Sequence, residues 1–132
     1  MYWGEGTPSS EACHTSIGLA QPHMAFCLPD GQTSNGHQTW TLVANPNPGA
    51  GTVELTHLPQ RAGKTVNFKD EIPPGSRRTY NRAGVEGKYP GIEGRTSIVV
   101  SSLDGARPIM VERVMYNYDR ALGTDSVGGF TD

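Results

Sequence analysis

Four side chains that bind metals or form disulfides lie close together near the start of the sequence. They are Cys13, His14, His23 and Cys27, with His37 a little further on. Zinc accepts such nitrogen and sulfur ligands tetrahedrally, but adjacent Cys and His residues do not match the common zinc motifs. Two cysteines in a turn-rich stretch favour a Cys13–Cys27 disulfide, as in oxidised, secreted domains. A zinc site and two free thiols are the alternatives.

Hydrolytic chemistry has little support in the sequence. There is no Gly-x-Ser-x-Gly segment, which would present a nucleophilic serine on a sharp turn. A glycosidase needs two carboxylates about 5–10 Å apart, and Glu5, Glu54, Glu112 and Asp125 supply carboxylates without a supporting motif. Calcium would need closely spaced oxygen ligands in a loop, and none is present. We therefore expect no catalytic residue, no cofactor and no metal.

Two charged residues, Glu112 and Arg113, interrupt an apolar segment near the C-terminus. Adjacent residues of a strand point to opposite faces, so these two cannot pair with each other. One of them facing solvent is the simpler explanation. If either is buried it needs a partner, because a buried unpaired charge is very costly. Glu5 and Arg78 are the natural candidates for a structural ion pair.

The aromatic residues raise the possibility of sugar binding on a sheet face. Those considered are Tyr2, Trp3, Trp40, Tyr80, Tyr89, Tyr116 and Tyr118. Trp40 alternates with Leu42, which favours a place in the core. Tyr116 and Tyr118 share one face of their segment, and Tyr118 precedes two charged residues. Carbohydrate or surface binding is therefore an alternative function.

The composition indicates an all-β domain of 132 residues with 17 glycines and 10 prolines. The longest stretch free of both is Ile109–Leu122. Because globular helices average about 11–12 residues, an all-α fold has almost no room for them. A net charge of −2 without a basic run argues against nucleic acid as a partner. Nothing approaches the ~20 apolar residues of a membrane span.

Short alternating runs separated by turn residues predict the strands. The runs are 37–44, 52–58, 64–69, 76–81, 95–102 and 109–118, with short terminal strands near Tyr2 and Ser126. The first two look like a hairpin. The run 109–118 also has helical spacing, but Pro108 at its start favours a strand. Residues 9–36 lack alternation and predict a long loop or insertion pinned by the two cysteines. The predicted core is Trp40, Leu42, Val53, Leu55, Phe68, Ile98, Val100 and Val111.

Five sequence blocks in order resemble a known kind of module. They are Trp3–Thr7, Gln38–Asn47, Pro74–Thr79, Pro108–Tyr116 and Gly123–Gly129. Together they resemble one copy of an immunoglobulin-like β-sandwich that occurs in tandem in large secreted or cell-surface proteins of actinobacteria, Chloroflexi and related bacteria. The sequence departs from that pattern over residues 9–36. The expected fold is a single sandwich over residues 1–132, with about seven to nine strands.

The resemblance implies a non-catalytic, extracellular or cell-surface structural module. Tandem copies join end to end, so a single copy leaves its terminal segments exposed. We expect copies of the same chain or neighbouring domains to be the partners, with glycans as the alternative. The apolar residues Tyr2, Trp3, Val127 and Phe130 would then contribute to filament-forming contacts through added strands.

Overall fold

The computed structural model describes residues 2–7, 10–16, 18–60, 63–82, 92, 94–117 and 122–132, the first two ranges up to position 14 by their backbone alone. Every regular element in this part of the chain is a strand. The strands are β1 Tyr2–Thr7, β2 Ser10–His14, β3 Ala25–Gln32, β4 Gln38–Asn45, β5 Gly51–Pro59, β6 Val66–Ile72, β7 Ser76–Asn81, β8 Arg95–Ser102, β9 Met110–Asn117, β10 Leu122–Ser126 and β11 Gly129–Thr131. Accordingly, none of the described residues forms a helix that could cross a membrane.

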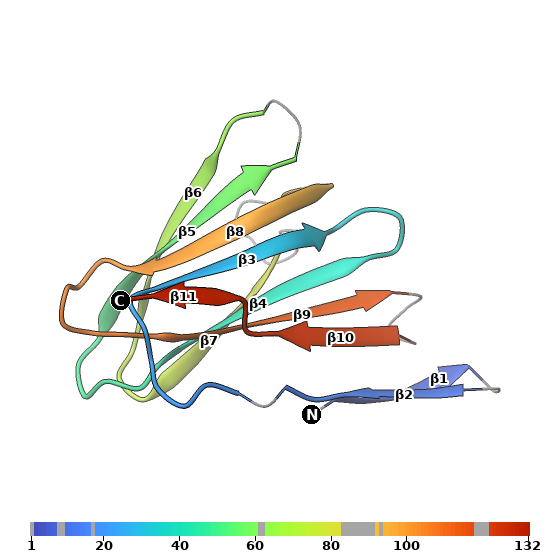
Figure 1. Cartoon of the computed structure of the whole chain (residues 1–132), viewed down its shortest axis with the longest axis horizontal. Coiled ribbons are helices and arrows are strands. Elements are labelled where there is room, and N and C mark those ends of the chain that lie inside the picture. Colours follow the sequence, from blue (N-terminus) through green and yellow to red (C-terminus); the bar gives the residue numbers. More distant parts are fainter. Residues whose placement is uncertain are drawn as a thin grey trace.

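Two antiparallel sheets pack face to face as a β-sandwich (Figure 1). The four-stranded sheet has the order β10-β9-β4-β7, and the five-stranded sheet has the order β11-β3-β8-β5-β6. Strands β1 and β2 form a separate hairpin beside β10, outside the four-stranded sheet (Figure 1). The predicted all-β sandwich is confirmed, and so is the strand at 109–118, which appears as β9.

Two predictions about connectivity are wrong. Strands β4 and β5 belong to opposite sheets, so the short connection between them crosses the sandwich and closes no hairpin. Residues 9–36 contain β2 and β3, and β3 pairs with both β8 and β11. The alternation of β3 is hidden because Pro29, Asp30 and Gly31 form a bulge, where the register to β8 shifts.

The core lies between the sheets and consists mainly of aliphatic side chains. Its buried members are Phe26, Leu28, Val43, Val53, Leu55, Ile72, Tyr80, Ile98, Val100, Ile109 and Val111, with Leu19 and Phe68 packed against them. Five of the eight predicted core residues are fully buried, and Phe68 is partly buried. Trp40 and Leu42 were assigned to the wrong face, since both point away from the core.

Strand β4 turns its polar face inward, where Thr39 and Asn45 find main-chain partners, whereas the buried Thr41 hydroxyl has no hydrogen-bond partner among the described residues. The Thr39 hydroxyl donates to the Gln32 carbonyl at 2.6 Å. The Asn45 amide donates to the Gly49 and Ile72 carbonyls at 2.9 and 3.0 Å. A buried polar group that is hydrogen-bonded costs little, so this face is stable inside. Trp40, Leu42 and Ala44 consequently face outward.

Buried arginines connect the two sheets at one end of the sandwich. Arg82, directly after β7, is 0% exposed, and its Nη2 donates to the Thr96 carbonyl of β8 at 3.0 Å. Arg113 of β9 donates from Nη1 to the Pro29 carbonyl of β3. Gly31 leaves the space for Arg82, because a Cβ there would lie 1.7 Å from its Nη1. The interior at this end is therefore polar.

Replacing Gly31 by alanine is expected to expel the Arg82 guanidinium from the interior. That group is the end of a flexible side chain, but it is fully enclosed and can move only by leaving its carbonyl partner. We expect a loss of about 3 kcal/mol in the free energy of unfolding, measured by urea titration. Gly105→Ala, with open space around the new Cβ, is the matched control. Equal stabilities of the two variants would contradict this packing.

His57 of β5 is buried beside Arg82, and desolvation followed by the arginine charge lowers its pKa to about 3. The folded state therefore keeps His57 neutral, while the unfolded chain takes up its proton below about pH 6.5. This contribution to stability is complete above pH 6.5 and is lost as the pH falls toward 3, by about 3 kcal/mol at pH 4. The unfolding temperature of His57→Gln should fall less than that of the parent as the pH is lowered from 7 to 4, and an equal fall in both proteins would contradict this assignment.

Candidate functional site

The outer face of the four-stranded sheet carries an unusual set of side chains. Strand β4 presents Trp40, Leu42 and Ala44 outward, since the alternate residues are buried. In register, Trp40 lies opposite Val114 on β9 and Leu42 lies opposite Glu112. On the other side Leu42 lies opposite Thr79 of β7 and Ala44 opposite Arg77. Apolar residues thus run down the middle of this face, with Thr79 and Arg77 of β7 on one flank and Glu112 of β9 on the other.

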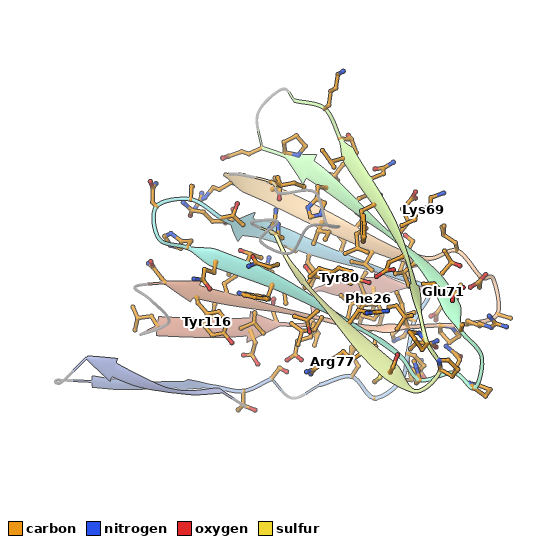
Figure 2. All side chains as sticks on the ribbon, turned by 180° about the vertical axis from the view of Figure 1, so that it is seen from behind. Phe26, Lys69, Glu71, Arg77, Tyr80 and Tyr116 are labelled. Atoms are coloured by element: carbon orange, nitrogen blue, oxygen red, sulfur yellow. The ribbon has the colours of Figure 1, made fainter. Side chains whose placement is uncertain are left out.

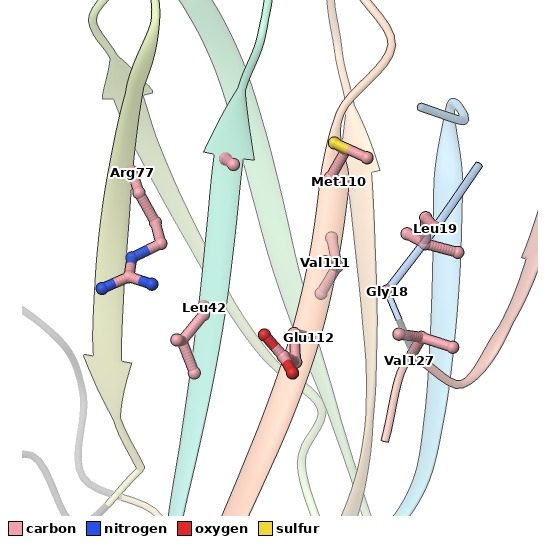
Figure 3. Close-up of a pocket in the computed structure, with 9 residues that line it drawn as sticks. Gly18, Leu19, Leu42, Arg77, Met110, Val111, Glu112 and Val127 are labelled. Atoms are coloured by element: carbon pink, nitrogen blue, oxygen red, sulfur yellow. The ribbon is translucent and has the colours of Figure 1, made fainter. Parts of the chain in front are cut away.

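A groove follows this face and has two parts. One part is a depression of about 170 Å³ that includes Leu42, Arg77, Met110, Glu112 and Val127 in its lining (Figure 3). The other, of about 220 Å³, is lined by Trp40, Leu42, Arg77, Thr79, Val114 and Tyr116. Because Leu42 and Arg77 line both parts, we treat them as one feature and call it the outer-face groove.

Opposite charges flank the middle of the outer-face groove. Arg77 extends from β7 and Glu112 from β9, with Leu42 between them (Figure 3). Glu112 accepts a hydrogen bond from the Ser16 hydroxyl, which ties the segment after β2 to this rim. Arg77 is exposed and makes no ion pair with any residue that the structure describes. The groove therefore offers a guanidinium and a carboxylate from opposite sides.

Two aromatic residues lie at one end of the outer-face groove. Gln38 is opposite Tyr116, and Trp40 is opposite Val114, so Trp40 and Tyr116 are diagonal neighbours on the same face. Diagonal cross-strand residues are within reach of aromatic side chains. Trp40 is partly exposed, and its indole N–H donates to the Gln38 side-chain oxygen at 3.4 Å. Figure 2 shows Tyr116 and Arg77 on the side of the four-stranded sheet that faces the hairpin.

The predicted disulfide finds no support. Cys27 is an exposed free thiol on β3, opposite Gly129 and Val99 in register. Cys13 lies on β2, opposite Trp3 of β1, and its side chain falls outside the described part. Among the described residues no group of three or more His, Cys, Asp or Glu side chains could hold a metal ion.

Of the charged residues predicted to pair, those whose side chains are described do not pair with one another. Arg113 is buried and donates to the Pro29 carbonyl and to the Ser126 hydroxyl, the latter at 3.0 Å. Glu112 faces outward in the groove. Arg78 is exposed on β7, and the side chain of Glu5 is outside the described part. Burial lowers the pKa of Arg113, and the nearby Asp30 carboxylate opposes that effect.

The terminal residues predicted to take part in assembly lie in three different settings. Tyr2 and Trp3 belong to β1, whose side chains are not described, although its backbone pairs with β2. Val127 is partly buried and lines the outer-face groove. Phe130 of β11 stacks on His23, with ring centroids 3.8 Å apart, while His23 Nδ1 lies 2.7 Å from the Asp132 carboxylate. Strand β10 pairs with β9 and strand β11 pairs with β3, all within the same chain.

Sequence reasoning considered an aromatic platform but placed Trp40 in the core, and it missed Arg77 altogether. One signal was present: Glu112 in an apolar strand marks the outward face of β9, and its cross-strand neighbours share that face. The sequence does not give the register between β4 and β9, so it could not show that Leu42 lies opposite Glu112 and shares its outward face.

Comparison with known proteins supports the fold. No family model matches the sequence, and no curated protein matches it. A crystal structure of Thermotoga maritima 1070 matches with a TM-score of 0.66 at 17% identity, over 83% of this chain and 95% of that chain. The Anabaena sensory rhodopsin transducer matches with a TM-score of 0.56 at 14% identity, over 72% and 85% respectively. At such identities the likeness establishes a shared β-sandwich architecture.

Proposed function

We propose that this chain is a non-catalytic glycan-binding module and that the outer-face groove is its recognition surface. The observation that carries the proposal is the placement of Trp40 and Tyr116 on one sheet face beside Arg77, Thr79 and Glu112. The proposal keeps the extracellular location and the immunoglobulin-like type expected from the sequence, and it replaces assembly by carbohydrate recognition as the first function.

The chemistry of the outer-face groove suits a sugar chain. A pyranose ring has an apolar face of C–H groups, which packs on aromatic and aliphatic side chains, and a rim of hydroxyl groups. Each hydroxyl both donates and accepts, so it can pair with a guanidinium on one side and a carboxylate on the other. Leu42 and Val114 provide the apolar floor, while Arg77, Thr79 and Glu112 provide donors and acceptors along the rims.

A protein partner would also use Trp, Tyr and Arg, which are enriched at interfaces. Two properties of the groove favour a glycan over a protein. Its two parts measure only about 170 and 220 Å³, and polar side chains border the apolar strip, Arg77 and Thr79 on β7 and Glu112 on β9. A small depression with an apolar floor and polar groups at its sides suits a chain of hydroxylated rings, whereas a protein partner would be better served by a broad apolar surface.

Trp40→Ala is expected to abolish or strongly weaken retention on immobilised or gel-embedded polysaccharides. Truncation of a central aromatic contact typically costs about 2 kcal/mol, or roughly 30-fold in Kd. Affinity electrophoresis across a panel of soluble polysaccharides, followed by calorimetry with the best ligand, measures this. Thr56→Ala, on the outer face of the five-stranded sheet, is the control. Equal retention of Trp40→Ala and the parent, at matched thermal stability, would contradict the proposal.

Assembly of copies of the chain is the second candidate, and one observation favours it. Strand β11 forms an edge of the five-stranded sheet with only three residues, and Phe130 within it is 51% exposed. Short edge strands expose main-chain groups to which another chain can add a strand.

For this second candidate, sedimentation should show oligomers of the parent that Phe130→Asp converts to monomers. Leu103→Asp changes another exposed apolar residue, 45% exposed in the turn after β8, and should leave the oligomers intact. A parent chain that sediments as a monomer at high concentration would remove assembly from consideration and leave glycan binding untouched.

A further inference from the structure

A second cavity, distinct from the outer-face groove, lies at the end of the sandwich where β3 and β9 end and β8 and β10 begin. It has a volume of about 360 Å³, within the range of small-molecule sites. Its lining comes from β3, the β3–β4 turn, β8, β9 and β10, and it includes Asp30, Gln32, His37, Arg95, Tyr116 and Asn117. Tyr116 lines both this cavity and the outer-face groove.

The bulge in β3 places a carboxylate at this cavity. Leu28 pairs with Ile98 and Gly31 with Thr96, so Pro29 and Asp30 together lie opposite the single residue Ser97 and form the bulge. Asp30 has a φ of 55°, which is unusual for a residue other than glycine. Bulges commonly redirect a side chain next to a functional site, and this one is held from inside by the hydrogen bond from Arg113 to the Pro29 carbonyl.

The charges in the cavity are matched. Arg95 Nε lies 3.5 Å from the Asp30 carboxylate, and the two side chains are 50% and 64% exposed respectively. Paired in this way they carry no net charge toward a ligand, but they still offer several N–H donors and carboxylate acceptors. An anion or a cation would therefore gain little here, whereas a neutral ligand with many hydroxyl groups can pair with both.

The remaining polar groups are held in fixed orientations. His37 Nδ1 lies 3.0 Å from the Ser34 carbonyl, and since a carbonyl only accepts, Nδ1 is the donor of this hydrogen bond, which orients the ring. The Gln32 amide donates to the Ser34 hydroxyl at 3.3 Å, which leaves its carbonyl oxygen as an acceptor. Met115 and Leu122 add an apolar wall. Fixed polar groups beside an apolar wall are the features that recognise a sugar ring.

We infer that this end cavity binds one neutral sugar ring, the terminal residue of the glycan whose chain lies in the outer-face groove. The inference rests on the proposed function and adds a preference for chain ends. The glycan would pass Tyr116, which belongs to both sites. Asp30 and Arg95 would hold the hydroxyl groups of the terminal ring, and the apolar wall would contact its C–H face.

The test uses methyl glycosides of glucose, galactose, mannose and N-acetylglucosamine as probes, titrated into the isotope-labelled full chain and followed by amide chemical shifts. We expect millimolar binding of at least one glycoside, with shifts at Asn117 and Gly123. Asp30→Asn, which tolerates the positive φ, and Arg95→Gln should each raise its Kd at least tenfold. Arg77→Gln and Trp40→Ala, in the outer-face groove, should leave the Kd of the monosaccharide unchanged while weakening polysaccharide binding.

The other outcomes separate the two proposals. If polysaccharide binding depends on Trp40 but no methyl glycoside binds, the sugar site in the end cavity is wrong and the glycan site in the outer-face groove is supported. Glycoside binding that is equal in the parent, Asp30→Asn and Arg95→Gln would overturn the sugar site in the end cavity as well, because the ring would sit elsewhere. Binding of glycine or inorganic phosphate without binding of glycosides would overturn the assignment to a neutral sugar. If Asp30→Asn loses glycoside binding while Trp40→Ala leaves polysaccharide binding unchanged, the sugar site in the end cavity is supported. The glycan site in the outer-face groove is then wrong.

Discussion

Burying a guanidinium between two sheets requires a main-chain acceptor and the space to hold the group, and the arrangement of this end of the sandwich depends on both. Arg82 is fully enclosed and reaches across to the Thr96 carbonyl of the opposite sheet. It fits because Gly31 has no side chain. Leaving such a charge without hydrogen bonds would cost far more than any single aliphatic contact contributes. The positions of β3, β7 and β8 at this end of the molecule are therefore linked through one side chain.

The same requirement decides which face of β4 is inside. Thr39 lies beside Gly31, its carbonyl accepts from the backbone N–H of Arg82, and its hydroxyl donates to the Gln32 carbonyl. Once Thr39 is committed to this polar interior, the period of two along a strand directs Trp40 and Leu42 outward. The apolar strip of the outer-face groove is thus a consequence of the polar end of the core, because β4 cannot turn both of its faces inward.

The bulge in β3 connects the interior with the end cavity. Its Pro29 carbonyl accepts from the buried Arg113, while Asp30, the next residue, extends to Arg95 at the cavity. A backbone held from inside in a conformation of positive φ gives a carboxylate a fixed position at the surface. The buried Arg113 thus holds Pro29, the residue directly before Asp30, although Arg113 itself is not proposed to contact a ligand.

The sequence alone was sufficient for the class and for most strands. Its frequent Gly and Pro residues exclude long helices, and alternation located β4 to β9, including β9 itself, where a helix was the alternative. It also identified Val53, Leu55, Ile98, Val100 and Val111 as core, from the alternation of their strands. Alternation says that a strand has two faces, but it names the buried one only when the faces differ clearly in polarity. In β4, Trp and Leu on one face oppose Thr and Val on the other, so the choice fell to Arg82, Gly31 and the carbonyls around them. Sheet membership, the groove and the cavity likewise depend on contacts between residues far apart in the chain, and local pattern carries no information about those.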